Sequence, residues 1–371
     1  MHSTNKVVDI CLRYAKLALA AGILAMPCFA SAQSSVTLYG SLDAGIGYNS
    51  NIGGKQQWEA TSGNSQPDQW GLLGKEDLGG GVKAGFQLEN GFLTTTGAMT
   101  RSGYIFNRKA LLFLSSDEYG TLTMGHSAPL SYLWINPLGT AVLGNIYEGY
   151  HPGNIDELTT STPAIQDNMI RYVSRSYYGL QAGAEISLGN TTNFAYGRST
   201  AYGLNYSNGP LRAAITYAIE ANRPTSIGSA IGFASFQGVA GTSTYTADRL
   251  ANFDVAASYV IGPFRLHGMY TNVNLRHAGY SDTFQTFEAG TNFRSSPANL
   301  LDLSAYTATL VGRRWTQASL IDTYYLSKTT SLYAAAVYQH ASGGAVAVIY
   351  SNAPSSGPNQ LALRTGIHHT F

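Results

Sequence analysis

Asp156 and Glu157 are the side chains of this sequence best suited to chemistry, because two adjacent carboxylates can act as an acid–base pair or supply half of a metal site. His368 and His369 form a second such pair, since imidazole is a common metal ligand. Adjacent residues of a strand point to opposite faces, so these histidines are poorly placed to bind one ion. Adjacent acids in a loop are more often a solvated pair than a catalytic one. We therefore predict no catalytic site, no metal site and no cofactor.

Two glycine-rich stretches, 45–47 and 79–81, also fall short of a phosphate-binding loop. The first lies within a predicted strand, and the second is a hairpin turn that no helix follows. The eight histidines form no recognisable active-site motif. A triad dispersed along the chain stays open as an alternative, and hydrolysis of lipid or peptide by the purified protein would favour it. Our prediction is that the protein is not an enzyme.

Residues 1–32 are predicted to be a cleaved signal peptide. Basic residues precede an apolar run at 17–26, and its length of about ten residues is too short for a transmembrane helix. Ala30-Ser31-Ala32 supplies the small residues of a cleavage site, so residues 33–371 form the mature chain, a single domain. A lipoprotein modified at Cys28 is the alternative, and it fits badly with the proline just before that cysteine.

The composition of the mature chain excludes several classes of protein. Removing three basic residues and one acid with the leader leaves 19 basic against 20 acidic residues, which gives no basic surface for nucleic acid. Only 12% of all residues are charged, about half the usual share of a soluble domain. No stretch of the mature sequence approaches 18 consecutive apolar residues, so no transmembrane helix is expected. Low charge with 25 tyrosines fits a chain whose outer surface meets lipid one residue at a time.

Apolar and polar residues alternate along much of the chain. Between Leu180 and Leu188, for example, the even positions are apolar and the odd positions carry Gln181, Gly183, Glu185 and Ser187. The same period of two recurs in 35–49, 211–220, 253–261, 264–271 and 360–371. This period is typical of strands with one apolar face.

The connections between these strands fall into two classes. Seven are short and rich in turn residues, at 77–81, 117–120, 177–179, 208–210, 262–263, 297–299 and 327–329. The connections between successive turns are often much longer, at about 50–67, 93–105, 129–167, 189–199, 221–248 and 343–359. Seven turns that alternate with eight loops require sixteen strands. A sheet that crosses a membrane must close, because an unpaired edge in lipid is too costly. We therefore predict an all-β fold, a 16-stranded antiparallel transmembrane β-barrel.

The charged residues of the predicted strands support this topology. Nearly all fall on the polar face, which is the lumen of such a barrel: Asp43, Lys83, Glu89, Arg108, Arg171, Arg175, Glu185, Arg212, Glu220, Asp254, Arg265, Glu288, Arg294, Asp302 and Arg364. In a soluble barrel, the alternative, the charged face would be the outside, and the chain has few charges to cover it. Lys109 and Asp322 fall on the lipid-facing parity, which the pattern does not explain.

Several motifs resemble the general trimeric porins of Gram-negative outer membranes. They are the opening at 34–40 (SSVTLYG), Trp70-Gly71-Leu72 before 75–81 (KEDLGGG), 119–125 (YGTLTMG), Asp167-Asn168 before Ile170-Arg171-Tyr172, 326–329 (LSKT) and the terminal Phe371. The matches run in order from residue 34 to residue 371. The resemblance implies a homotrimer among outer-membrane lipids, with one pore in each subunit for the passive diffusion of small polar solutes and ions.

The resemblance also implies that the third external loop, here 129–167, folds into the lumen and narrows it. In such porins, loop acids face a ladder of basic residues on the pore wall. The matching acids are Glu148, Asp156 and Glu157, and the matching wall residues are Arg108, Arg171 and Arg175. Gln69 and Leu73 stand where the family often carries positive charge, so we expect weak selectivity that the loop acids tip toward cations.

A substrate-specific channel of the same fold is the alternative to a general diffusion pore. Its mark would be an aromatic track, for which the predicted loop offers Tyr132, Trp134, Tyr147 and Tyr150. A barrel enzyme of the outer membrane, such as a lipase or protease, is the further alternative.

Overall fold

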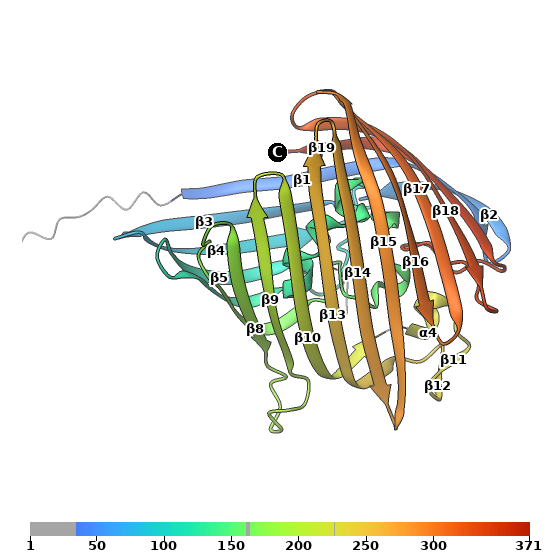
Figure 1. Cartoon of the computed structure of the whole chain (residues 1–371), viewed down its shortest axis with the longest axis horizontal. Coiled ribbons are helices and arrows are strands. Elements are labelled where there is room, and N and C mark those ends of the chain that lie inside the picture. The colour runs from blue at the N-terminus through green and yellow to red at the C-terminus, as the bar shows by residue number, and fades with distance from the viewer. Residues whose placement is uncertain (1–34, 161–163, 226) are drawn as a thin grey trace, which may run out of the picture.

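The computed structural model describes residues 35–160, 164–225 and 227–371. The predicted signal peptide, residues 1–32, lies outside the described residues. The chain forms a closed antiparallel barrel in which β19 pairs with β1, so that the sheet has no open end (Figure 1). Within the described part of the chain, no helix is long and apolar enough to cross a membrane.

The barrel strands are β1 (Ser35–Ile52), β2 (Lys55–Ser62), β3 (Gln69–Gly79), β4 (Val82–Gly91), β5 (Lys109–Ser116), β6 (Gly120–Ser127), β7 (Gln166–Val173), β8 (Leu180–Ser187), β9 (Ser199–Asn208), β10 (Leu211–Thr225), β13 (Tyr245–Ile261), β14 (Phe264–His277), β15 (Tyr280–Ser296), β16 (Asn299–Leu310), β17 (Arg313–Tyr325), β18 (Thr330–Ser342) and β19 (Asn359–Thr370). The loops contain α2 (Leu130–Trp134), η1 (Asn136–Leu138), α3 (Thr140–Leu143), η2 (Tyr147–Gly149), η3 (Pro152–Asn154), α4 (Ile227–Ile231), β11 (Ser235–Phe236) and β12 (Val239–Ala240).

The second barrel strand is broken into two parts. The first half of β1 pairs with β3, from Ser35 to Ser41, and its second half pairs with β2, from Ala44 onward. β2 and β3 therefore occupy one position, and the seventeen strands of the sheet fill the sixteen positions that the sequence predicts. The predicted external loop at 50–67 is wrong, because β1 and β2 continue through most of it as a hairpin that turns at Gly53-Gly54.

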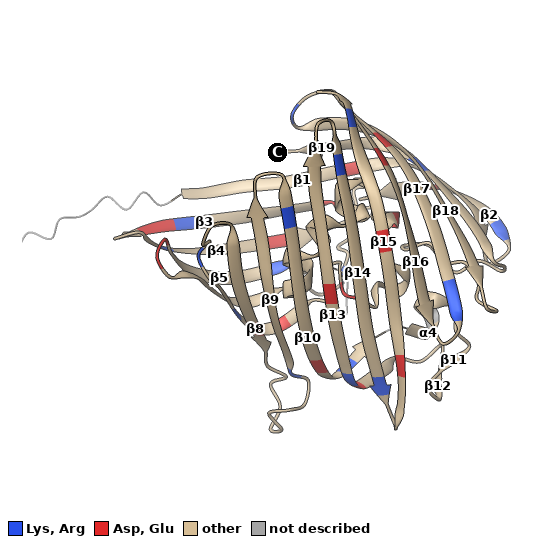
Figure 2. Cartoon of the chain, in the orientation of Figure 1, with Lys and Arg blue, Asp and Glu red and all other residues tan. Residues whose placement is uncertain are grey.

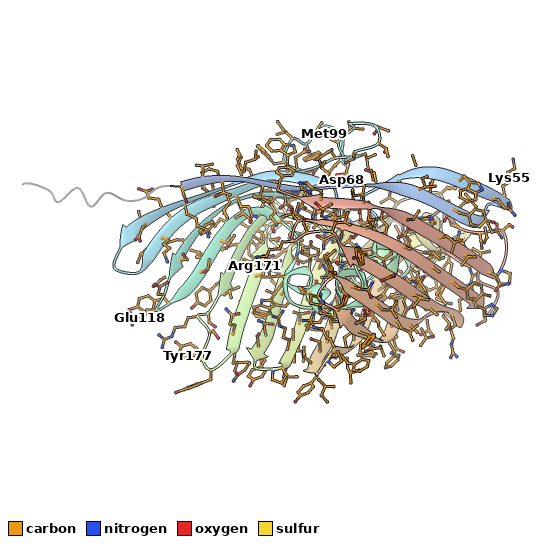
Figure 3. The ribbon with its side chains drawn as sticks, turned by 90° about the horizontal axis from the view of Figure 1, so that it is seen from above. Lys55, Asp68, Met99, Glu118, Arg171 and Tyr177 are labelled. Atoms are coloured by element: carbon orange, nitrogen blue, oxygen red, sulfur yellow. The ribbon has the colours of Figure 1, made fainter. Side chains whose placement is uncertain are left out.

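All seven predicted tight turns join strands at one end of the barrel, the plain end. Figure 3 shows this end at Glu118 and Tyr177, while Lys55 lies at the opposite, loop-bearing end. The long loops predicted near 93–105, 189–199 and 343–359 connect strands at the loop-bearing end. Strand β10 extends to Thr225 and β13 begins at Tyr245, so the loop predicted at 221–248 is shorter than expected.

The strands are apolar outside and polar inside. Along β17, Gln317 and Ser319 are buried, whereas Leu320 is 49% exposed. Because water-exposed surface in a soluble fold is normally the polar one, this inversion is typical of a barrel whose outer face contacts lipid. Charged residues are sparse over the strands (Figure 2).

Lys109 and Asp322, the two charged residues on the lipid-facing parity of the sequence pattern, lie in different settings. Lys109 is wrongly assigned to the lipid face: it is the first residue of β5, it pairs in register with Glu89, and its Nζ lies 3.1 Å from the Glu89 carboxylate inside the barrel. Arg108 precedes the strand, so strand alternation does not set its direction. Asp322 is exposed on the outer face near the end of β17, where Asn299 donates a hydrogen bond to its carboxylate.

Loop segments fill much of the barrel interior (Figures 1 and 3). One buried cluster combines α4 and β11 with the end of the barrel wall and the last loop, through residues such as Ile231, Phe233, Trp315 and Val348. A second cluster joins α2 to β9 and β10 through Leu130 and Trp134. The lumen is thus narrowed by packed loops rather than by one loop alone.

Candidate functional site

The third loop, described over residues 129–160 and 164–165, folds into the lumen. Leu130, Ile135 and Ile146 are fully buried, so the loop is held by apolar contacts. Trp134 faces Gly183 on β8 and Gly203 on β9, where an added Cβ would lie 2.5 and 3.0 Å from the indole. Glycine at both positions therefore makes room for the ring, and Trp134 anchors the loop to the wall. This placement does not fit the aromatic track predicted for Trp134.

The acid Glu148 ends in an ion pair with the barrel wall. Its Oε1 accepts from Nε of Arg364 on β19, and both side chains are buried. Gln317 of β17 donates to the backbone carbonyl of Glu148 at 2.8 Å. Burial raises the pKa of Glu148, although the guanidinium of Arg364 opposes this shift. Glu148 therefore binds the loop to two strands.

The acid Asp156 lies in a buried network with His151. The Asp156 carboxylate contacts Nδ1 of His151, and Nε2 of this histidine lies 3.0 Å from Glu288 on β15. Thr271 of β14 also donates to Asp156, at 3.0 Å. Burial disfavours the charged imidazole, but the carboxylates of Asp156 and Glu288 outweigh it and raise the pKa of His151 to about 10. His151 is therefore protonated at neutral pH and links two acids.

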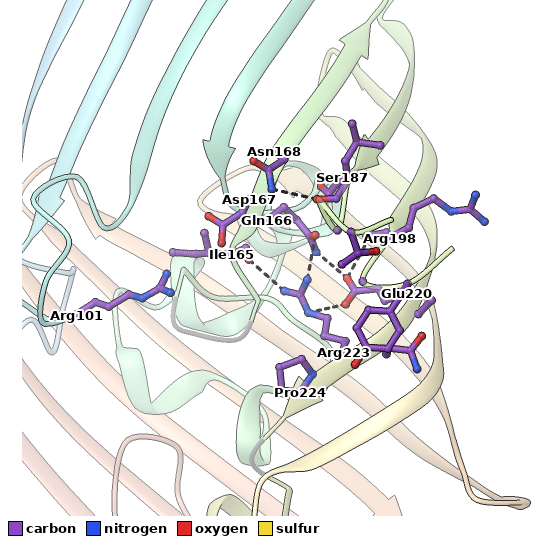
Figure 4. Close-up of a pocket in the computed structure, with 18 residues that line it drawn as sticks. Arg101, Ile165, Gln166, Asp167, Asn168, Ser187, Arg198, Glu220, Arg223 and Pro224 are labelled. Carbon is purple, nitrogen blue, oxygen red and sulfur yellow. Dashed lines mark hydrogen bonds and ion pairs between the residues drawn. The ribbon is translucent and has the colours of Figure 1, made fainter. Parts of the chain in front are cut away.

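The acid Glu157 lies against two charged residues of β10. Its Oε1 is 3.2 Å from Nε of Arg223, and the same nitrogen lies 2.6 Å from Glu220. Gln166 of β7 donates to Glu220 at 2.7 Å, and Figure 4 shows Gln166, Glu220 and Arg223 beside a cavity at the loop-bearing end. Burial and the charge of Glu220 raise the pKa of Glu157 well above its usual range. All three predicted acids thus fasten the loop instead of facing open lumen.

The three predicted wall arginines lie in three different settings. Arg108 is buried, contacts Glu89 at 2.8 Å and donates to Thr160 of the loop at 2.5 Å. Arg171 is also buried, but it pairs with Glu185 at 2.6 Å and donates to the loop carbonyl of Ala128. Arg171 therefore supports the base of the loop.

Arg175 does not belong to a constriction. It follows β7 at the plain end, is exposed, and stacks on the ring of Tyr177 at 4.3 Å. The structure does not place Arg175 on the pore wall, where the sequence predicted it. Because β7 ends at Val173, strand alternation does not set the direction of the Arg175 side chain.

Tyr132, Tyr147 and Tyr150 gather near Arg108, as an aromatic track would require. Tyr147 and Tyr150 contact each other edge to face with ring centroids 5.3 Å apart. Tyr350 of the last loop completes the group, 5.2 Å from Tyr147 and 5.5 Å from Tyr150. The sequence offered no signal for Tyr350, because only folding brings residue 350 beside the third loop.

Three neighbouring cavities run past this group. The first, of about 350 Å³, is lined by Arg101 and Arg108 at the loop-bearing side, and the second, of about 290 Å³, by the three tyrosines of the loop. The third, of about 170 Å³, is lined by Lys328 and other residues of the plain end. The first and second share Pro67, Tyr147 and Thr160, whereas the second and third share Ser65 and Gln66. The cavities therefore adjoin one another in a row from the loop-bearing side to the plain end.

A group of arginines at the plain end has no acidic partner. Arg212, Arg265 and Arg294 share the inward parity of the buried residues Thr216, His267 and Asn292. None of the ion pairs formed within the described residues involves them. Two of the three line a cavity of about 660 Å³ between the turns at 262–263 and 297–298. The sequence pattern predicted that these arginines face the lumen, but it did not predict that they lack acidic partners.

Comparison with known sequences gives consistent matches. The profile of the Gram-negative porin family matches residues 17–344. The chain is 33% identical over 233 residues to an outer membrane porin protein of Bordetella pertussis, an alignment that covers 54% of this chain and 58% of that relative. It thus spans less than two thirds of that relative's length. The chain is also 27% identical over 374 residues to outer membrane porin protein 32 of Delftia acidovorans, covering 96% of this chain and 99% of the relative.

Comparison with solved structures shows the same fold. The anion-selective porin from Comamonas acidovorans superposes with a TM-score of 0.75 at 22% identity, over 91% of this chain and 100% of that one. The trimer form of OmpT, an outer membrane protein of Vibrio cholerae, superposes with a TM-score of 0.66 at 14% identity, over 91% and 99%.

Proposed function

Because this chain belongs to the Gram-negative porin family, we propose that it is a passive diffusion channel for small hydrophilic solutes and ions across the bacterial outer membrane. The observation that carries this proposal is the row of adjoining cavities between the loop-bearing and plain ends. The inverted barrel, apolar outside and polar inside, is the structure that holds such a path in lipid. A channel of this kind needs no catalytic group.

The charges along the path favour a modest preference for anions. The loop acids that were expected to favour cations are held in ion pairs, Glu148 and Glu157 with Arg364 and Arg223 of the wall and Asp156 with His151 of the same loop. The first cavity is lined by Arg101, by the acid Asp68 and by Arg108, whose charge is already paired with Glu89. The preference therefore rests on Arg101 and on the unpartnered arginines, two of which line a further cavity at the plain end. Charges that line a water-filled lumen select ions by sign. This reverses the weak cation preference expected from the sequence.

Reconstitution of the purified protein in a planar lipid bilayer tests both statements. We expect ohmic conductance and, in a salt gradient, a reversal potential of the sign given by faster anion passage. A preparation without conductance would overturn the diffusion function. A cation-selective current would overturn the anion preference alone.

A substrate-specific channel is the second candidate, and the tyrosine group beside Arg108 favours it. Three phenol rings next to a guanidinium suit a planar solute that carries a carboxylate, because aromatic faces stack and arginine pairs with carboxylate oxygens. Current that falls in a saturable way as benzoate is added would support this candidate. Conductance that benzoate leaves unchanged would favour the general pore.

We also propose a homotrimer. The trimer form of a protein with the same fold supports this assembly. Light scattering of the detergent-solubilised protein, corrected for bound detergent, tests it by mass: all 371 residues, the predicted signal peptide included, weigh 39.6 kDa. A mass near that of one chain would refute the proposal.

A further inference from the structure

We propose that residues 63–68, the break in the second barrel strand, form the wall of the solute path opposite the third loop, and that the Gln66 side chain sets the width of the path there. This inference rests on the proposed diffusion function. These six residues cannot all pair with β1. Only Leu42 and Asp43 of β1 lie between the part that pairs with β3 and the part that pairs with β2. The break therefore displaces a short segment from the sheet.

The displaced segment is held rigidly by Asp43. The carboxylate of this residue, which is fully buried, accepts the backbone N–H groups of Asn64 at 3.2 Å and Ser65 at 3.0 Å. The hydroxyl of Tyr333 donates to the same carboxylate at 2.8 Å. Ser41 donates to the carbonyl of Pro67 at 2.7 Å. Side chains thus form hydrogen bonds with the buried backbone groups that sheet pairing leaves free. These bonds stabilise the break in a defined conformation.

Asp68 fastens the other end of the segment. Its Oδ1 accepts the backbone N–H of Asp43, and its Oδ2 accepts the hydroxyl of Ser62 and the N–H of Thr94, the last at 3.0 Å. The segment also reaches the third loop directly, since the N–H of Tyr147 donates to the carbonyl of Asn64 at 2.6 Å. Wall, segment and third loop are therefore one hydrogen-bonded assembly.

The segment lies at both junctions of the cavity series. Pro67 lines the first and second cavities together with Tyr147 and Thr160, and Ser65 and Gln66 line the second and third. The segment therefore borders both places where neighbouring cavities adjoin. Both Asp43 and Asp68 accept hydrogen bonds from the segment or its neighbours, and Asp68 also lines the first cavity.

Gln66 is the side chain of the segment with the most freedom. It is partly exposed, and its amide donates only a long hydrogen bond, 3.4 Å to Asn145. A bulky group attached at this position would enter the junction of the second and third cavities. Its effect on current should therefore be steric for any permeating ion, with a smaller dependence on the sign of the attached charge.

Cysteine modification tests this placement in bilayers. The cysteines of the sequence are Cys11 and Cys28, both in the predicted signal peptide, and mass spectrometry of the purified protein verifies that they are absent. Gln66→Cys is treated with a cationic and, separately, an anionic methanethiosulfonate reagent. We expect both to lower single-channel conductance, by about twofold or more, because a constriction limits the current by its diameter. Gln57→Cys, an exposed glutamine of β2 outside all three cavities, is the matched control and should keep its conductance.

The outcomes separate this inference from the proposed function. A conducting Gln66→Cys channel whose labelling is complete by mass and whose current is unchanged would overturn the inference and leave the diffusion function intact. Absence of conductance in the unsubstituted protein would overturn both. Gln66→Ala provides a check without chemical modification: a shorter side chain should raise conductance, and a fall would count against the proposal.

Discussion

The two ends of the barrel use their charges in opposite ways. From the middle of the barrel to the loop-bearing end, acids of the third loop meet basic partners, as Glu148 meets Arg364 halfway along β19 and Glu157 meets Arg223 near the end of β10. At the plain end, Arg212, Arg265 and Arg294 face the lumen without an acidic partner. The pairs are buried, whereas the arginines of the plain end are at least partly exposed.

The difference teaches which charges hold structure and which act on solutes. A buried charge must be paired, since an isolated one costs several kcal/mol. Once paired, it contributes little field to the lumen. An exposed, unpaired guanidinium costs little and attracts passing anions. Position along the barrel axis, and not residue type, therefore separates the two roles.

The largest expected effect comes from breaking a loop anchor. Arg364→Met leaves Glu148 buried without its ion pair, so we expect a loss of about 3–5 kcal/mol in the free energy of unfolding. Denaturant unfolding in lipid vesicles, followed by tryptophan fluorescence, measures it. Adding Glu148→Gln to the same chain should recover much of the loss. Equal stability of the single variant and the parent would show that the pair does not anchor the loop.

A smaller effect on the third loop is expected from a change of pH. The folded pKa of His151 is raised to about 10 from an ordinary value of 6.5, so the stabilisation from its protonated form is complete below about 6.5 and is lost as pH rises through about 10. Between pH 8 and pH 11 we expect the third loop to loosen, with a cost on the order of a few kcal/mol. The measurement is current noise and unfolding midpoint against pH. His151→Gln should flatten this dependence, and a profile that it leaves unaltered would contradict the assignment.

Removing the unpaired charges should change selectivity without changing stability. The triple variant Arg212→Gln, Arg265→Gln, Arg294→Gln is expected to lower the anion-to-cation permeability ratio by about twofold. Reversal potentials in a salt gradient give the ratio, and denaturant unfolding gives stability. A large loss of stability with unchanged selectivity would place these arginines in the structural class instead.

The smallest effect is expected for Arg175→Gln, which serves as the control for the triple variant. Arg175 lies at the plain end but stacks on the exposed ring of Tyr177 outside the cavity series. We expect unchanged permeability ratios and a stability change within about 0.5 kcal/mol. A clear shift in selectivity would return Arg175 to the pore wall.

The sequence by itself determined the barrel, because the information is local. Alternation with period two and glycine, proline and asparagine at turns fix strands and hairpins within a few residues of each other. Sixteen strand positions, the seven tight turns and the polar lumen followed from these patterns. Alternation does not predict the direction of a side chain at or beyond the end of a strand. Lys109 begins β5 and Arg175 follows β7, and the pattern placed both wrongly.

Only the tertiary structure decided how the lumen is filled. Glu148 and Arg364 are 216 residues apart, and Tyr147 and Tyr350 come from different loops, so no local pattern announces either contact. The break at 63–68 was hidden for a related reason. Its glycine, serine and proline residues are typical of an external loop. The segment lies inside the barrel because the buried carboxylate of Asp43 on the neighbouring strand accepts two of its backbone N–H groups. Long-range pairing of buried charges and backbone groups, which only the closed barrel brings together, set the path that the alternating strands enclose.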